Sequence, residues 1–208
     1  MAKSTKPKST TSYKDTAFGI IPRSKVVVFE QEGVKKAQQY TIKLSEDKAK
    51  ITPDLIRNVH KVGFGFIFPD WAGKFRTINV TVGEYEPPHY SRIPELIKNL
   101  CDDLSKRLNH LSFPKSGENF LVEVIALLAW FQHRFVWTHP FKDYNGRIAR
   151  LLTNLLALDL GLPILTIKAE TGRDRERYIK ALKAADREDY SKLEELIAKA
   201  LRESFDKV

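Results

Sequence analysis

Residues 139–150 read His-Pro-Phe-Lys-Asp-Tyr-Asn-Gly-Arg-Ile-Ala-Arg, and the interpretation of the whole chain depends on this stretch. Asp143 is a candidate helix N-cap, because its carboxylate can accept hydrogen bonds from free backbone N–H groups. The helix that follows presents those N–H groups at the positive end of its dipole, which favours an anion. Arg147 and Arg150 are three residues apart and therefore lie near each other on the helix surface. The stretch predicts an anion site at a helix N-terminus.

The residue types in this stretch suit a polyphosphate. Guanidinium groups bind phosphate oxygens in pairs. The carboxylate of Asp143 is suited to hold Mg²⁺ between phosphate oxygens. His139 precedes the helix by a short loop and is suited to take a proton from an attacking hydroxyl. Taken singly, each feature is more often structural, since a histidine beside a proline commonly packs in a core. Their coincidence within twelve residues favours a functional site.

Apolar periodicity on both sides of the stretch predicts a mainly α fold. Residues 120–137 are apolar nearly all round, which is typical of a buried helix. Residues 75–83 alternate between apolar and polar side chains, which predicts a half-buried strand. The short apolar run at 24–31 is compatible with a strand or a helix start, and Glu32-Gly33 interrupts it. Further helices are expected at 52–63, 94–111, 144–160 and twice more before the C-terminus.

Composition excludes several classes of protein. Cys101 is the single cysteine, which excludes an internal disulfide framework and favours the cytoplasm. No uninterrupted apolar run approaches the roughly 18–20 residues of a membrane span, so no membrane partner is expected. The net charge is +9, and residues 1–25 hold six Lys or Arg against one acid. We expect residues 1–22 to form a disordered basic tail; the alternative, a nucleic-acid arm, lacks any reader motif in the chain.

The stretch at 139–150 resembles the signature of the Fic family, H-P-F-x-[D/E]-G-N-[G/K]-R-x-x-R, and matches eight of its nine specified positions. The resemblance extends over roughly residues 50–205. It implies a Fic-type helical bundle with a short β-hairpin flap, in which residues 51–208 form the catalytic domain and residues 23–50 an N-terminal segment with an inhibitory helix. It also implies a protein adenylyltransferase, which transfers AMP from ATP to a Ser, Thr or Tyr hydroxyl of a target protein with the help of Mg²⁺.

The resemblance assigns a role to each matching residue. His139 would be the catalytic general base, and Asp143 would bind Mg²⁺. The nucleotide would be bound by Asn145, Gly146, Arg147, Arg150 and Tyr178, the last beside the adenine. The flap would dock the target by adding its backbone as a strand, using Ile78, Asn79, Val80 and Thr81.

Tyr144 departs from the family pattern, which usually has glycine at this position. Glycine lets a phosphate approach bare backbone, whereas tyrosine adds bulk and restricts positive φ. Three outcomes are open: the ring points away and AMP transfer survives, the nucleotide binds in another pose, or activity is lost. The alternatives to AMP transfer are removal of AMP, transfer of phosphate, and a silent binding module. Phosphate transfer is disfavoured because its motif usually has lysine where this chain has Gly146.

Many Fic proteins carry an inhibitory helix with the motif [S/T]-x-x-x-E-[G/N]. Glu32-Gly33 matches its end, although Val28 replaces the Ser or Thr. The resemblance therefore implies that the Glu32 carboxylate inhibits the enzyme by pairing with Arg150 in competition with a phosphate. A separate antitoxin-like protein is the alternative inhibitor, and the enzyme is a candidate for self-modification.

Overall fold

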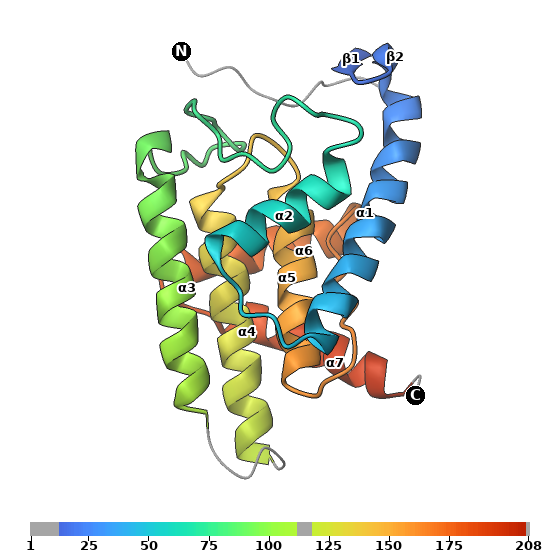
Figure 1. The fold of residues 1–208 in the computed structure, drawn as a ribbon. Coiled ribbons are helices and arrows are strands. Elements are labelled where there is room, and N and C mark those ends of the chain that lie inside the picture. Colours follow the sequence, from blue (N-terminus) through green and yellow to red (C-terminus); the bar gives the residue numbers. More distant parts are fainter. Residues whose placement is uncertain (1–12, 112–117, 207–208) are drawn as a thin grey trace.

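The structure is a computed structural model that describes residues 13–111 and 118–206, and it is a bundle of helices (Figure 1). This confirms the predicted mainly α fold. A two-stranded antiparallel hairpin precedes the helices, with Tyr13 paired to Pro22 at its open end. The elements are β1 (Tyr13–Thr16), β2 (Gly19–Pro22), α1 (Arg23–Glu46), α2 (Pro53–Phe64), the short 3₁₀ helix η1 (Tyr90–Arg92), α3 (Ile93–Asn109), α4 (Glu118–Thr138), α5 (Asn145–Asp159), α6 (Gly172–Ala185) and α7 (Ser191–Phe205).

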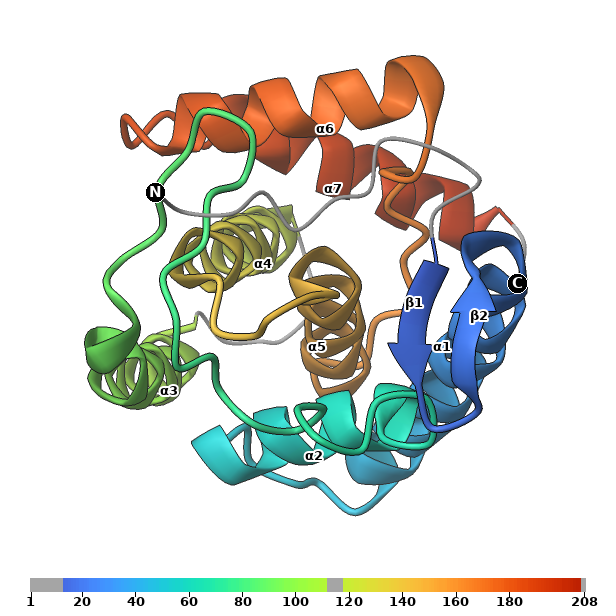
Figure 2. The ribbon, with the colours of Figure 1, turned by 90° about the horizontal axis from the view of Figure 1, so that it is seen from above.

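Helix α5 stands near the centre of the bundle. It contacts α1, α2 and α4, and the view from above shows it surrounded by the other helices (Figure 2). Its side chains Ile148, Leu152 and Leu155 are fully buried. The β1–β2 hairpin and the long α2–α3 connection lie at the same end of the bundle as the N-terminus of α5 (Figure 1). The fold therefore places the 139–150 stretch at one end of a buried helix, beneath two non-helical segments.

Helix α4 is the most apolar helix of the bundle, as its sequence predicts. Residues Asn119–Thr138 are long and apolar enough to cross a membrane by length and composition, although no uninterrupted apolar run suggested this. Half of the apolar window is buried within the fold, and α4 packs against α3, α5 and α7. Burial on several sides is what the core helix of a bundle requires.

Helix α1 is longer than the sequence predicts. The interruption expected at Glu32-Gly33 does not occur, and one helix runs from Arg23 to Glu46. Gly33 lies against Gly63 of α2, where a Cβ atom on Gly33 would meet the Gly63 carbonyl oxygen at 2.0 Å. The glycine therefore serves the close approach of two helices, and this tertiary contact outweighs its low helix propensity.

Two other local expectations differ from the structure. Residues 13–22, expected within the disordered tail, form the β1–β2 hairpin, because the Ala17 N–H bonds to the Ile67 carbonyl and Phe18 stacks on Phe29. Residues 1–12 of that tail lie outside the described residues. The strand predicted at 75–83 is absent, and the segment has only an isolated bridge between Val82 and Tyr85.

Candidate active site

A pocket of about 470 Å³ lies at the N-terminus of α5. It brings together the expected catalytic, metal and nucleotide residues with Thr81 of the flap. Several cationic side chains that were not singled out in the sequence also line it. The residues that matter for the chemistry are Lys14, Arg23, Thr81, His139, Lys142, Asp143, Asn145, Gly146, Arg147, Arg150, Glu170, Arg175 and Tyr178. The excess of cations over carboxylates makes the pocket suitable for an anion.

The loop before α5 is held in an uncommon backbone conformation. His139 and Tyr144 both have positive φ, of 48° and 65°. The Asn145 side chain closes the loop, since its Oδ1 accepts from the Phe141 N–H at 2.8 Å and its Nδ2 donates to the Phe141 carbonyl at 2.9 Å. The Asn145 amide thus fixes the loop, and His139 is half-buried at the pocket wall.

Asp143 presents one carboxylate oxygen to a cation. Its Oδ1 accepts from the Tyr144 N–H at 2.8 Å, while its Oδ2 lies 3.2 Å from the Lys14 ammonium of β1. No cluster of three or more metal-ligating side chains occurs among residues 13–111 and 118–206. A site that holds Mg²⁺ between one carboxylate and substrate phosphates does not need such a cluster. The donor set at Asp143 therefore fits magnesium.

The Tyr144 ring points away from the anion site and into the core. It stacks on Phe64 at 3.9 Å between ring centroids and also lies parallel to Trp71. Burial raises the pKa of its hydroxyl, which therefore stays protonated and donates to the Glu30 carboxylate at 2.7 Å. Tyr144 also lines the pocket, where the Lys14 ammonium and the Arg147 guanidinium lie 5.7 Å and 5.3 Å from its ring centroid. The core packing of the ring corresponds to the geometric part of the first outcome left open by the sequence, and the survival of AMP transfer stays a prediction.

Glu30, rather than the expected Glu32, is the α1 carboxylate that reaches the signature. It is 1% exposed and binds Arg23, the Tyr144 hydroxyl and Arg147. Burial alone would raise the pKa of the Glu30 carboxyl, but hydrogen bonds from Arg23 and Tyr144 and the charge of Arg147 outweigh it and lower the pKa. The group is therefore ionised at neutral pH.

The position of Glu32 is a correction to the sequence analysis. Its side chain is half exposed and pairs with Lys36 one turn further along α1. Glu32 lies two positions after Glu30, which corresponds to about 200° around a helix. Glu32 therefore lies on the opposite side of α1 from the pocket and does not pair with Arg150.

Arg150 pairs with Glu170, an exposed residue in the α5–α6 connection. It also hydrogen-bonds to the hydroxyl of Tyr178, which in turn accepts from Gln132 of α4. Tyr178 is 5% exposed, so most of its ring packs in the core while one side borders the pocket. Its role beside adenine stays a prediction. Gln132 is fully buried and was missed in the sequence, because a single polar residue in an apolar helix carries no pattern.

The flap is attached to the signature by Arg76, which the sequence did not single out. Its Nε donates to the His139 carbonyl at 2.8 Å, and its backbone N–H donates to the Pro140 carbonyl at 2.9 Å. Its remaining guanidinium nitrogens donate to the carbonyls of Ile78 and Pro88 at the two ends of the flap. The Arg76 side chain thus holds the segment in its loop conformation.

His60 of α2 fixes the signature from its inner side. Its Nδ1 accepts from the Gly73 N–H at 3.0 Å, so its Nε2 carries the proton and donates to the Asp143 carbonyl at 3.2 Å. The ring stacks on Phe141 at 3.9 Å between centroids. Burial lowers the pKa of His60 from 6.5 to about 4, so the imidazole is neutral at pH 7.

This buried histidine predicts a dependence of stability on pH. Between pH 6.5 and pH 4 the unfolded chain binds a proton at His60 that the folded chain does not bind. The free energy of unfolding should therefore fall with falling pH, by about 2 kcal/mol from pH 7 to pH 5 on account of this group. Urea denaturation of the wild type and of His60→Gln at both pH values measures the difference in slope. The variant should lose less stability on acidification, and His110→Gln, an exposed site, should behave as the wild type. Equal slopes for His60→Gln and the wild type would contradict this account.

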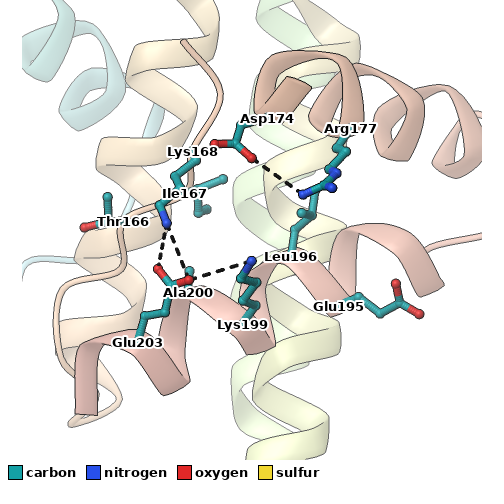
Figure 3. A pocket seen from close by; sticks show the side chains of 10 residues that line it. All are labelled: Thr166, Ile167, Lys168, Asp174, Arg177, Glu195, Leu196, Lys199, Ala200 and Glu203. Carbon is teal, nitrogen blue, oxygen red and sulfur yellow. Dashed lines mark hydrogen bonds and ion pairs between the residues drawn. The ribbon is translucent and has the colours of Figure 1, made fainter. Parts of the chain in front are cut away.

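A second pocket, of about 230 Å³, lies between the α5–α6 connection and helices α6 and α7 (Figure 3). Its charges are satisfied locally: Lys168 and Lys199 pair with Glu203, and Arg177 pairs with Asp174. Because these cations already pair with carboxylates, this pocket attracts an anionic ligand less strongly than the pocket at α5 does. The α5 pocket is therefore the candidate active site.

Comparison with known proteins identifies a family and several relatives. The model of the Fic/DOC family matches residues 50–157. The chain is 28% identical over 199 residues to the protein adenylyltransferase Fic of Nematostella vectensis. The aligned region covers 95% of this chain and 43% of that protein. It is 32% identical over 156 residues to the protein adenylyltransferase fic-1 of Caenorhabditis briggsae, covering 75% of this chain and 28% of that protein. The chain thus spans less than half the length of these curated relatives.

Solved structures resemble the fold closely. Fic-1 from C. elegans superposes with a TM-score of 0.65 and 27% identity, covering 84% of this chain and 48% of that one. The BepC effector protein from Bartonella tribocorum, solved with bound AMPPNP, has a TM-score of 0.71 and 19% identity, covering 93% of this chain and 94% of that one. At that identity the second likeness concerns the fold alone.

Proposed function

The chain belongs to the Fic/DOC family, and on that premise we propose that it is a protein adenylyltransferase, which transfers AMP from ATP to a hydroxyl side chain of a target protein. The observation that carries the proposal is the convergence of His139, Asp143, Arg147 and Arg150 on one pocket at the N-terminus of α5. The named activity of the C. briggsae and N. vectensis relatives supports it.

The pocket has the electrostatics that a nucleotide triphosphate requires. Arg147 and Arg150 offer guanidinium donors beside the free N–H groups of the first turn of α5. This turn is uncrowded at Gly146, since a Cβ atom there would make only an ordinary contact with the Arg150 guanidinium, at 3.6 Å. Glu170 is 62% exposed, so its contact with Arg150 can be replaced by a phosphate at little cost. We assign the polyphosphate to this end of the pocket.

His139 is proposed as the general base. Its ring takes the proton of the target hydroxyl as the hydroxyl oxygen bonds to the α-phosphorus of ATP. The bond between the α-phosphorus and the bridging oxygen breaks, and pyrophosphate leaves with that electron pair. The positive φ of His139 and the Arg76 hydrogen bond to its carbonyl fix the backbone from which the ring projects. Asp143 would hold Mg²⁺, and the bound ion would neutralise part of the negative charge of the phosphates.

The flap is proposed as the surface that receives the target. Ile78 and Asn79 are exposed, Val80 is buried and Thr81 borders the pocket. This loop runs from Arg76, which contacts the His139 carbonyl, to Thr81 at the pocket wall. A target strand added along it would bring its hydroxyl toward His139.

Intact-protein mass spectrometry after incubation with Mg-ATP tests the proposed activity. Such an enzyme needs a hydroxyl acceptor, so we would assay the chain both alone, for self-modification, and with a cell lysate and labelled ATP. A mass gain that matches AMP on the chain or on a lysate protein is the expected result. A gain that matches phosphate would indicate the alternative transfer, and loss of AMP from a modified protein would indicate the reverse reaction. No adduct in either format would contradict the proposal.

A further inference from the structure

The Glu30 carboxylate is held by groups from three parts of the fold. Arg23, at the first position of α1, donates to both of its oxygens, with the longer contact at 3.0 Å. Arg147 of α5 donates to Oε2 at 3.1 Å, and the Tyr144 hydroxyl donates to Oε1 at 2.7 Å. Both carboxylate oxygens are therefore occupied. A buried carboxylate with this many charge-assisted bonds is costly to remove from its place.

The carboxylate lies behind the two arginines as seen from the pocket. Among the described residues, Arg23 and Arg147 line the pocket and Glu30 does not. Both guanidinium side chains are 27% exposed, whereas Glu30 is 1% exposed. A carboxylate that competes with a phosphate must stand where the phosphate would stand, and Glu30 stands on the other side of its partners.

The charge of this cluster also favours an anion in the pocket. One carboxylate faces two guanidinium groups, so the cluster keeps a net positive charge. Arg23 commits two of its five N–H donors to Glu30 and Arg147 commits one, which leaves donors on each for a phosphate. The forked contact fixes the plane of the Arg23 guanidinium before any ligand arrives, which lowers the entropy lost on binding.

We infer that Glu30 is a positioning residue that aims Arg23 and Arg147 into the pocket, and that Arg23 is an additional phosphate-binding residue contributed by α1. The inference rests on the proposed function for its ligand, the polyphosphate of a nucleotide. It assigns to the α1 carboxylate the role opposite to inhibition, because the carboxylate pairs with Arg147 from behind and does not contact Arg150, which pairs instead with Glu170.

Calorimetric titration of the full chain with two probes, AMPPNP and inorganic tripolyphosphate, tests the inference. We expect Arg23→Gln to weaken the binding of both probes about tenfold, the loss of one charge-assisted phosphate contact. We expect Glu30→Gln to weaken both about fivefold, because Arg147 and Arg23 lose their fixed orientation. Glu46→Gln, an exposed acidic site at the end of α1, is the matched control and should bind as the wild type.

The outcomes separate positioning from inhibition. Tighter binding of both probes by Glu30→Gln would overturn the inference and make Glu30 an inhibitor. Unchanged binding by Arg23→Gln, or no binding of tripolyphosphate to the wild type, would overturn it as well. If Glu30→Gln does not fold, two variants of Arg23 decide whether it binds phosphate. Arg23→Gln removes the charge, and Arg23→Lys keeps the charge but loses the forked guanidinium contact. The inference and the proposed function can also fail separately. If Arg23→Gln weakens tripolyphosphate binding but neither the wild type nor any variant transfers AMP, the inference holds and the proposed function fails.

Discussion

Replacing His139 with asparagine is expected to lower the rate of AMP transfer by about 10³-fold, because the target hydroxyl would lose its general base. Asparagine suits the test, since it tolerates the positive φ of 48° that His139 adopts. The fold should therefore survive, and the hydrogen bond from Arg76 to the carbonyl of residue 139 should persist. AMPPNP should bind to the variant nearly as it binds to the wild type, because the phosphate donors are on other residues.

The measurement is the initial rate of labelled AMP incorporation, together with calorimetric AMPPNP binding and thermal denaturation of the same samples. His110→Asn is the matched control, because His110 is an exposed histidine at the end of α3, away from the pocket. A variant that folds, binds AMPPNP and still transfers AMP at the wild-type rate would remove His139 as the base. A variant that loses binding and transfer together would indicate that the imidazole holds the nucleotide.

The sequence predicts the helical bundle well where the signal is local and periodic. Thr52 and Pro53 mark the start of α2, and the structure shows the Thr52 hydroxyl accepting from the Leu55 N–H at 3.1 Å. Gly161, with φ of 80°, follows the end of α5 where the sequence places it. The signature at 139–150 is local as well, and its key residues line one pocket. Such features are decided by neighbours within a turn or two.

The sequence predicts poorly the features that distant segments decide. The continuity of α1 through Gly33 depends on Gly63, thirty residues later. An E-G pair does not reveal which side of a helix faces the signature. In the continuous helix Glu30 pairs with Arg147, whereas Glu32 pairs with Lys36 on the opposite side. The expected flap strand alternates in sequence, but within residues 13–111 and 118–206 no strand pairs with it, and Ile78 and Val82 are exposed.

Buried polar residues were also not predicted from the sequence. His60 and Arg76 each join the signature to another element, and Gln132 joins α4 to Tyr178 of α6 and Thr153 of α5. Arg76 stands in the stretch that resembles the family's flap, but the sequence gives it no role, and His60 and Gln132 stand in no motif. Their partners are mostly backbone carbonyls or single hydroxyls that a sequence does not mark. The site therefore consists of a recognisable local signature held by supports that only the fold reveals.

Replacing Tyr144 with glycine, the residue usual in the family, is expected to destabilise this protein by about 3 kcal/mol. The glycine would relieve the positive φ of 65° at this position, a gain of about 1 kcal/mol. It would also remove a ring that is 5% exposed and stacked on Phe64, and leave Glu30 without its hydroxyl donor. The loss of a buried aromatic ring and of a hydrogen bond to a charged group outweighs the relief of the backbone.

Urea denaturation and AMP transfer measured on the same samples test the role of this tyrosine. Tyr144→Phe is the matched variant, because it keeps the stacked ring and removes only the donor to Glu30; we expect it to lose about 1–2 kcal/mol. Per folded molecule, both variants should transfer AMP no faster than the wild type, since the ring already lies outside the anion site and the hydroxyl supports the Glu30–Arg147 contact. A glycine variant that is as stable as the wild type and more active would show instead that the tyrosine obstructs the nucleotide. The two results differ in both stability and rate, so this one substitution decides whether the departure from the family signature supports the site or obstructs it.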